Sequence, residues 1–320
     1  MANPGISQLI STTLESQIPT IIDNITNGNV LLTKLKEKGN LVKNSGGNSI
    51  RETMNYASNG TVQFQGEYDT FDTTPADVIT SADFSHKILT GTTTMSGLEM
   101  KQNAGKEQII NLLDGKFKAL RASLANQIGS SVYADGTGSG GQEIGGLQLL
   151  VADDPTTGTV GGIDRSTAGG TFFRNQLWDA SVESVTLSAT TIQSAMNTLF
   201  IRCQAQGNEV PDLIMADAVY FGYYEDSLQT IQRLSNPDLG KLGFNTIKYK
   251  NADVAYDSAC PASHMYFLNT NHIFIKYIGK EMFEIGETVR PVNQDVYITP
   301  LIFTGNMTIT NARVHGTMIA

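Results

Sequence analysis

Three glycines with the spacing of a phosphate-binding loop are the first candidates for chemistry. Gly136, Gly138 and Gly141 satisfy GxGxxG, the fingerprint of dinucleotide sites. That fingerprint is specific only where a strand precedes it and a helix follows, because the pyrophosphate lies at the helix N-terminus. Here a long helical pattern precedes the glycines and a Gly/Ser/Thr-rich stretch follows. The sequence therefore favours a flexible helix exit over a nucleotide-binding enzyme.

The other residues that could do chemistry lie far apart in the sequence. Cys203 and Cys260 form no CxxC pair, and Asp153-Asp154 lie in a Gly/Pro/Thr loop that could hold a cation only weakly. GxxxxGK[ST], HExxH and GxSxG do not occur, and no nucleophile–base pair can be named. We therefore expect no enzyme activity, cofactor or metal. The histidines, which have no metal-ligand spacing, are His86, His264, His272 and His315.

The composition indicates a protein whose surface is covered by partners. Of 320 residues, 40% are hydrophobic and only 17% are charged, against about 25% in typical soluble domains. The net charge of −9 argues against a protein that grips nucleic acid through its phosphates, but permits one that lies near an anionic polymer. No apolar run approaches the ~18–20 residues of a membrane span, and the first residues lack a secretory pattern. We expect an obligate assembly with no membrane partner.

A long amphipathic pattern between Lys101 and Gly136 is the strongest structural signal. Its apolar residues recur at spacings of three and four, which places them on one stripe of an α-helix. About thirty residues at ~1.5 Å each give a rod of roughly 45 Å. We expect a helical spine with sheets laid along it; an ordinary long core helix is the alternative. The stripe comprises Ile109, Leu113, Phe117, Leu120, Leu124, Ile128 and Val132.

The stretch from Asn48 to Thr74 changes to a period of two and predicts a β-hairpin. An Asn-Gly pair between two alternating runs is a strong signal for a tight turn, because a type I′ turn needs positive φ at both central residues. A two-stranded hairpin alone is marginal in water, so its aromatic face must pack on its own chain or on a neighbour. The residue pattern leaves both open. The candidate interface residues are Tyr56, Asn59, Gly60, Phe64 and Tyr68.

The remaining patterns mix helices and strands without a regular βαβ rhythm, which is typical of an α+β fold. Short helical pieces with breakers fill the first 40 residues, and a Gly-rich connector follows the spine. Helices are expected at Leu187 to Ala205 and Ala216 to Gln232. Strands are expected at Val78 to Thr94, Pro211 to Met215, Phe244 to Tyr256, Met265 to Leu268, Ile273 to Tyr277 and Val296 to Ile319, the last with a turn at Gly305-Asn306.

Five phrases, in this order, resemble the major capsid proteins of tailed bacteriophages, which have the Hong Kong ninety-seven fold. They are YADGTGSGG followed by IGGL, GTVGGIDRST followed by FFRNQ, VPDLIMADAVYFGYY, HMYFLNTNHIFI and GNMTITNARVHGTM. The resemblance covers most of the chain and is weakest before about Asn40.

The resemblance implies a division of the chain and a function. It implies hexamers and pentamers that close into an icosahedral shell around double-stranded DNA, which the chain would contact non-specifically. The protein would belong to the virion capsid and assemble in the cytoplasm of a host bacterium. In the family the extended loop lies on an adjacent subunit, which would make the hairpin residues intermolecular contacts. The implied parts are an N-terminal arm at 1–40, an extended loop at 41–77, a peripheral domain with the spine helix at 78–146, an axial domain at 147–261, and return strands of the peripheral domain at 262–320, with the tail in either domain.

Two departures from the family limit what the resemblance implies. Some members join a loop lysine to an asparagine of a neighbour, but this chain has no lysine between Asn44 and His86. No long segment precedes the arm, so we expect a separate scaffolding protein, together with a portal. The alternative functions are an encapsulin-type compartment, a tail-tube or surface-layer protein and, more remotely, the nucleotide-binding enzyme.

Overall fold

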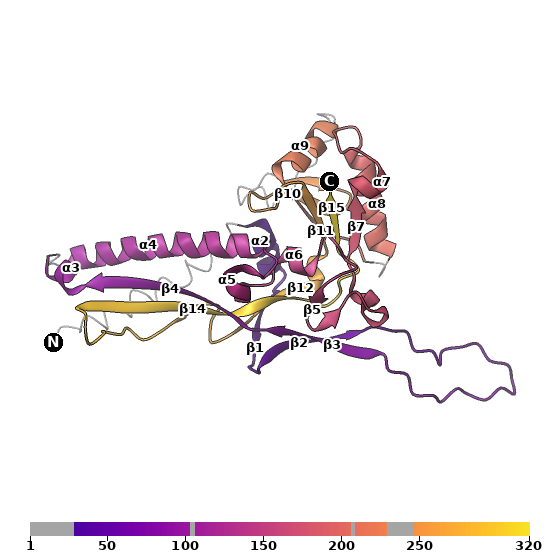
Figure 1. Cartoon of the computed structure of the whole chain (residues 1–320), viewed down its shortest axis with the longest axis horizontal. Helices are drawn as coiled ribbons and strands as arrows, with labels where there is room; N and C mark the ends of the chain where they lie inside the picture. The colour runs from indigo at the N-terminus through magenta and orange to yellow at the C-terminus, as the bar shows by residue number, and fades with distance from the viewer. Residues whose placement is uncertain (1–28, 103–105, 206–208, 229–245) are drawn as a thin grey trace.

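Two large sheets, two pairs of strands and several helices form an elongated molecule with a projection at each end (Figure 1). The computed structural model describes residues 29–102, 106–205, 209–228 and 246–320. One sheet has five strands and the other has six. The α+β class predicted from the sequence is confirmed. No helix in the described ranges is long and apolar enough to cross a membrane.

A long helix on two long strands forms the arm at one end of the molecule (Figure 1). The helix α4 spans Lys106–Ser131, and the strands β4, Lys87–Ser96, and β14, Val296–Ile309, pair antiparallel beside it. The predicted helical spine is therefore confirmed. Its buried apolar residues are Phe117, Leu124 and Ile128, followed by Val132 after the helix, whereas the side chains of Ile109 and Leu113 lie outside the described ones.

Helix α4 packs closely on β4 because residue 91 is a glycine. A Cβ atom at Gly91 would lie 2.6 Å from Cδ1 of Leu120, well inside the ~3.5–4.0 Å that carbon atoms prefer. A short helix, α3 at Gly97–Gln102, follows β4 at the far end of the arm.

The five-stranded sheet runs from the arm into the middle of the molecule. Strand β12, Ile273–Ile278, pairs antiparallel with β14 and parallel with β1, Leu41–Asn44, and β13, Glu284–Ile285, pairs with the other half of β14.

The turn predicted at Gly305-Asn306 is wrong, because β14 continues through both residues. A Cβ at Gly305 would lie 2.4 Å from the carbonyl oxygen of Lys276, so the glycine permits a close approach of strands. Asn306 donates its side-chain amide to the Ser85 carbonyl oxygen at 2.8 Å and accepts from the Gly145 N–H at 3.1 Å. Gly305 and Asn306 therefore hold β14 close to the segments that contain Ser85 and Gly145.

The six-stranded sheet forms a compact lobe above the arm, here called the lobe (Figure 1). Helices α8, Ile192–Ala205, and α9, Ala218–Ser227, pack on it. The Asp217 carboxylate begins α9 by accepting a hydrogen bond from the Tyr220 N–H at 2.8 Å. In spatial order the strands are β7 (Gln176–Asp179), β15 (Gly316–Ile319), β11 (His264–Leu268), β8 (Leu213–Ala216), β10 (Ala252–Tyr256) and β9 (Thr246–Tyr249).

Two expectations about the lobe need revision. The strand predicted from Phe244 to Tyr256 is divided into β9 and β10 by a turn in which Lys250 has φ +52°. The boundary predicted after residue 261 separates β11 from the sheet in which it pairs with β8 and β15. Residues 229–232, the end of the helix predicted to Gln232, lie outside the described ranges.

A connector of short elements links the arm to the lobe and is organised by a buried arginine. Arg165 is fully buried, and its guanidinium donates to the carbonyl oxygens of Phe173 at 3.0 Å and Leu150 at 2.6 Å. This cation is satisfied by main-chain dipoles, which fixes the turns of a Gly-rich segment. The elements are α5 (Gly138–Gly141), α6 (Leu147–Leu150), β5 (Thr159–Val160), β6 (Ile163–Asp164), η1 (Ala168–Phe173) and α7 (Ala180–Glu183).

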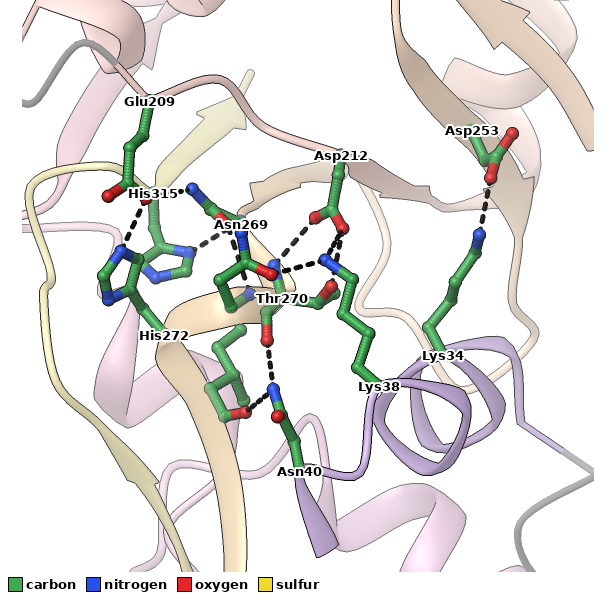
Figure 2. Close-up of polar contacts among 12 residues, drawn as sticks. Lys34, Lys38, Asn40, Glu209, Asp212, Asp253, Asn269, Thr270, His272 and His315 are labelled. Carbon is green, nitrogen blue, oxygen red and sulfur yellow. Dashed lines mark hydrogen bonds and ion pairs between the residues drawn. The ribbon is translucent and has the colours of Figure 1, made fainter.

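Helix α2, Val30–Glu37, joins the five-stranded sheet to the lobe (Figure 2). Lys34 binds Asp253 of β10 at 2.8 Å, and Lys38 binds Asp212, just before β8, at 2.5 Å. Its apolar residues lie in the core. Most of the predicted N-terminal arm, residues 1–28, lies outside the described ranges. The short 3₁₀ helix η2, Thr270–His272, completes this junction.

Candidate functional site

The projection opposite the arm is a loop carried on a two-stranded ribbon (Figure 1). Strands β2, Ser49–Asn55, and β3, Ile79–Ser85, pair antiparallel, with Asn55 opposite Ile79 at the outer end. Residues 56–78 between them contain no strand. We call these residues the extended loop.

The tight hairpin predicted at Asn59-Gly60 is wrong. Neither residue has a positive φ, and the alternating residues that follow them have no partner strand in the described chain; the strand that pairs with β2 begins at Ile79. Instead, the Asn59 side-chain oxygen accepts a hydrogen bond from the Thr61 N–H at 3.0 Å. This contact makes a local turn in the outgoing half of the loop.

Large apolar side chains of the extended loop face solvent. Four of them are between 83% and 109% exposed, although burying such a side chain is worth about 1.5–3 kcal/mol. Exposed apolar groups gathered on one segment mark an interaction site. They include Phe64 and Tyr68, predicted from the sequence, and Val62 and Phe71, which we had not singled out as interface candidates. Val62 belongs to the alternating run, whereas Phe71 lies beyond Tyr68, the last residue of that run.

Tyr56 differs from the other candidates because it packs on its own chain. Its ring centroid lies 5.6 Å from that of Phe172, and its N–H donates to the Val78 carbonyl oxygen at 3.1 Å. Tyr56 therefore anchors the start of the loop. The five predicted residues divide into an anchor, a local turn at Asn59 and Gly60, and two exposed rings.

The extended loop is acidic as well as aromatic. It has no Lys or Arg. The Asp69 carboxylate accepts from the Gly66 N–H at 2.6 Å, and that of Asp72 accepts from the Thr74 N–H at 2.9 Å. The hydrogen bonds from Thr74 lower the pKa of Asp72, so that group is ionised at neutral pH. The acids, all exposed, are Glu67, Asp69, Asp72 and Asp77.

A buried ion pair at the base of the ribbon fixes the direction of the loop. Glu52 of β2 is only 5% exposed, and its carboxylate accepts from Lys276 of β12 and from the hydroxyl of Thr308 of β14, each at 2.7 Å. The ribbon is thereby tied to two strands of the five-stranded sheet. A loop without strands of its own still leaves the body from a rigid base.

The glycine-rich loop after α4 has the context expected of a helix exit. Gly136 and Gly141 have φ of +77° and +81°, and the Gly141 carbonyl oxygen accepts a hydrogen bond from the side chain of Lys87. Helix α4 precedes this segment, whereas a dinucleotide site requires a strand in that place.

Two of the four histidines pair with carboxylates from other parts of the chain. His264 lies 2.9 Å from Asp153, whose hydrogen bond raises the pKa of that imidazole, and His272 lies 2.7 Å from Glu209. Both cysteines are buried and unpaired by disulfides, and burial raises the pKa of Cys203 to about 12. Within the described ranges, no group of three or more His, Cys, Asp and Glu residues could hold a metal ion.

Stability should fall in acid because His315 is buried as a neutral ring. Burial lowers its pKa from 6.5 to about 3. Between these values only the unfolded state binds the proton, so the free energy of unfolding falls as pH drops below 6.5, by up to about 1.4 kcal/mol per pH unit. His315→Leu should be less stable at pH 7.5, with a deficit that shrinks toward pH 4 in denaturant titrations.

His264→Gln is the matched control, because the raised pKa of His264 makes its contribution to stability depend on pH in the opposite direction. Its deficit should be larger in acid than at high pH. Parallel stability curves for the wild type and His315→Leu would contradict the assignment.

The comparisons with known proteins rest on structure alone. No protein-family model and no curated protein matches the chain. The fold is similar to the capsid of cyanophage A-1(L), with a TM-score of 0.63, 14% identity, and coverage of 88% of this chain and 90% of that one. It is also similar to the capsid of the Myoviridae phage XM1, with a TM-score of 0.55, 13% identity, and coverage of 89% and 91%.

An encapsulin has a similar fold. The SrpI encapsulin of Synechococcus elongatus PCC 7942 matches with a TM-score of 0.53 and 8% identity, over 89% of this chain and 86% of that chain. Two phage capsid proteins and an encapsulin are thus similar to this chain over most of its length. These similarities confirm the resemblance drawn from the sequence: the chain has the Hong Kong ninety-seven fold of tailed-phage major capsid proteins.

Proposed function

We propose that this chain is a major capsid protein that assembles as hexamers and pentamers into an icosahedral shell around double-stranded DNA. The observation that carries the proposal is the extended loop. It projects from a rigid base and exposes four large apolar side chains that have no partner in the described chain. A monomer would gain nothing from this arrangement, whereas a neighbouring subunit would bury those side chains.

Assembly by distributed burial is the mechanism. A loop on one side of a subunit that binds a different surface of the next makes a head-to-tail contact, and such contacts close into rings. A standard specific interface buries about 1,600 Å² in total, and a lattice subunit makes several. Individual contacts can be weak because a closed shell combines many of them.

The role is structural rather than catalytic. Several of the candidate groups already have partners within the chain: His264 has Asp153, His272 has Glu209, and Gly141 has Lys87. We therefore place the function of the chain in its contacts with neighbouring subunits.

Electron microscopy of the purified protein tests the proposal. We expect closed shells of hexamers and pentamers. Tubes would favour the tail-tube alternative, flat sheets would favour a surface layer, and a persistent monomer would exclude all three assemblies.

An encapsulin-type compartment is the second candidate, supported by the similarity to the SrpI encapsulin. Its shell would enclose protein cargo instead of DNA. Nuclease-treated particles from infected or producing cells separate the two: protected double-stranded DNA supports the capsid, and a co-purifying enzyme without DNA supports the compartment.

Shells of this protein should not be covalently crosslinked through the extended loop. No lysine occurs between Asn44 and His86, so the loop offers no amine for an isopeptide bond. Particles boiled in denaturant should run as a single band of subunit size on a gel. A ladder of covalent multimers would contradict this prediction.

We also propose a scaffolding protein and a portal as partners, together with non-specific contact with the packaged DNA and assembly in the cytoplasm of the host cell. Co-expression with candidate scaffolding proteins should raise the yield of uniform shells. Efficient formation of uniform shells from this chain alone would count against a separate scaffold.

A further inference from the structure

A cavity of about 340 Å³ lies at the base of the extended loop. It is formed where the end of β2, helix η1 and the segment after β14 meet. One wall is aromatic: Tyr56 and Phe172 have centroids 5.6 Å apart, and Phe172 and Phe173 have centroids 6.0 Å apart. Its volume is in the range of pockets that bind specific groups.

The rest of the lining is mostly polar and includes a cation. Arg313 lines the cavity, and no hydrogen bond or ion pair joins its guanidinium to the described part of the chain. His272 lies beside it, held by Glu209 at 2.7 Å and by the Thr310 hydroxyl at 2.9 Å. No lining residue is acidic. An Arg and aromatic rings in one cavity suit a carboxylate next to an apolar or aromatic group.

The extended loop carries that combination. Glu67, Tyr68 and Asp69 are consecutive, Phe71 and Asp72 are adjacent, and all five are exposed. The 23 residues from 56 to 78 run about eleven out and eleven back, so the loop reaches at most roughly 36–40 Å from its base. In the structure the loop extends away from its own ribbon base (Figure 1), so its far end is presented to another molecule.

We propose that the cavity receives the acidic, aromatic far end of the extended loop from a second copy of the chain. A loop carboxylate binds the Arg313 guanidinium, and a neighbouring loop ring packs on the Phe172 wall. The cavity at the loop base of each subunit thereby binds the extended loop of a neighbouring subunit. This inference rests on the proposed function and adds to it the surface that closes the ring.

Charge reversal tests the contact. Arg313→Glu should lower the yield of shells at least about tenfold, because it places like charges together. Glu67→Arg, Asp69→Arg and Asp72→Arg, each alone, test which loop acid is used. The chain that combines Arg313→Glu with reversal of that acid should regain most of the yield. Lys248→Glu, an exposed reversal in the lobe, is the matched control and should assemble as the wild type does.

Circular dichroism and thermal unfolding of unassembled subunits separate failed assembly from failed folding. A cryo-electron microscopy map of wild-type shells is the second measurement, and should show a loop carboxylate of one copy on Arg313 of the next.

The outcomes are distinct. If the wild type forms shells and Arg313→Glu assembles equally well, this inference is overturned and the proposed function stands. The same holds if the map of wild-type shells shows another segment, or nothing, in the cavity. Wild-type protein that forms no shells would overturn both.

Discussion

Replacing Phe64 with aspartate should leave the subunit folded and abolish its assembly into shells. Phe64 is fully exposed, so no contact within the described subunit depends on its ring. At a neighbour's surface the variant would lose about 1.5–3 kcal/mol of apolar burial and would bring a carboxylate into an apolar contact. A loss of about 3 kcal/mol lowers each pairwise association constant roughly 100-fold, and the effect is repeated at every loop of the shell.

Gln63→Asp is the matched control for Phe64→Asp. It adds the same charge one residue away, on another exposed side chain, but keeps the ring. Sedimentation and negative-stain microscopy should show shells for the wild type, fewer shells for Gln63→Asp, and only subunits or small oligomers for Phe64→Asp. Shells of Phe64→Asp in wild-type yield would show that the extended loop is not an interface.

Lys276→Met should destabilise the subunit by about 3–5 kcal/mol, because it leaves the carboxylate of Glu52 buried without its charged partner. Glu52 would keep the hydroxyl of Thr308 at 2.7 Å, but a hydroxyl does not neutralise a charge. The double variant Glu52→Leu/Lys276→Met should recover much of the loss, since apolar groups of similar size often replace a buried ion pair without cost.

Denaturant midpoints of unassembled subunits measure this effect. Arg51→Met is the control: Arg51 is the neighbour of Glu52 on β2, and its ion pair with Asp83 is exposed, so its removal should change the midpoint little. If Lys276→Met and Arg51→Met have equal midpoints, the Glu52 pair does not stabilise the base of the loop.

The spine helix could be predicted from the sequence because its signal is local and repeated. Phe117, Leu124 and Ile128 recur at helical spacing, and one face of a helix is decided by residues a few positions apart. The resemblance to capsid proteins rested on five short phrases in a fixed order, which are also local features of the sequence.

The hairpin could not be placed correctly, because strand pairing is decided at a distance. The run after Asn59-Gly60 alternates as a strand does, but Ile79–Ser85 is the partner of β2. Neighbouring Asn and Gly residues do not always mark a tight turn of the main chain. Asn59-Gly60 forms only a local side-chain turn, and Gly305-Asn306 lies within a continuous strand. In the second case glycine is needed because another backbone lies close by, which no local pattern reveals.

Of the residues that line the cavity at the base of the extended loop, only Tyr56 was an interface candidate from the sequence. Arg313 is a single cation in a closing strand-like segment, and Phe172 belongs to a connector that looked unstructured. Only folding brings them to the base of the loop. Phe71, likewise, lies beyond the alternating run that ends at Tyr68, and only its exposure in the folded chain marks it as a candidate.

The pairing of distant strands has a consequence for how the subunit is made. Strand β1 pairs with β12, β4 with β14, and β7 with β15, so every large sheet joins segments separated by more than a hundred residues of chain. Such a topology has high contact order, so folding requires slow closure of long loops. Until those loops close, the edges of unpaired strands stay exposed. We therefore expect the five-stranded sheet, which joins β1 and β4 to β12 and β14, to complete its strand pairing late in folding.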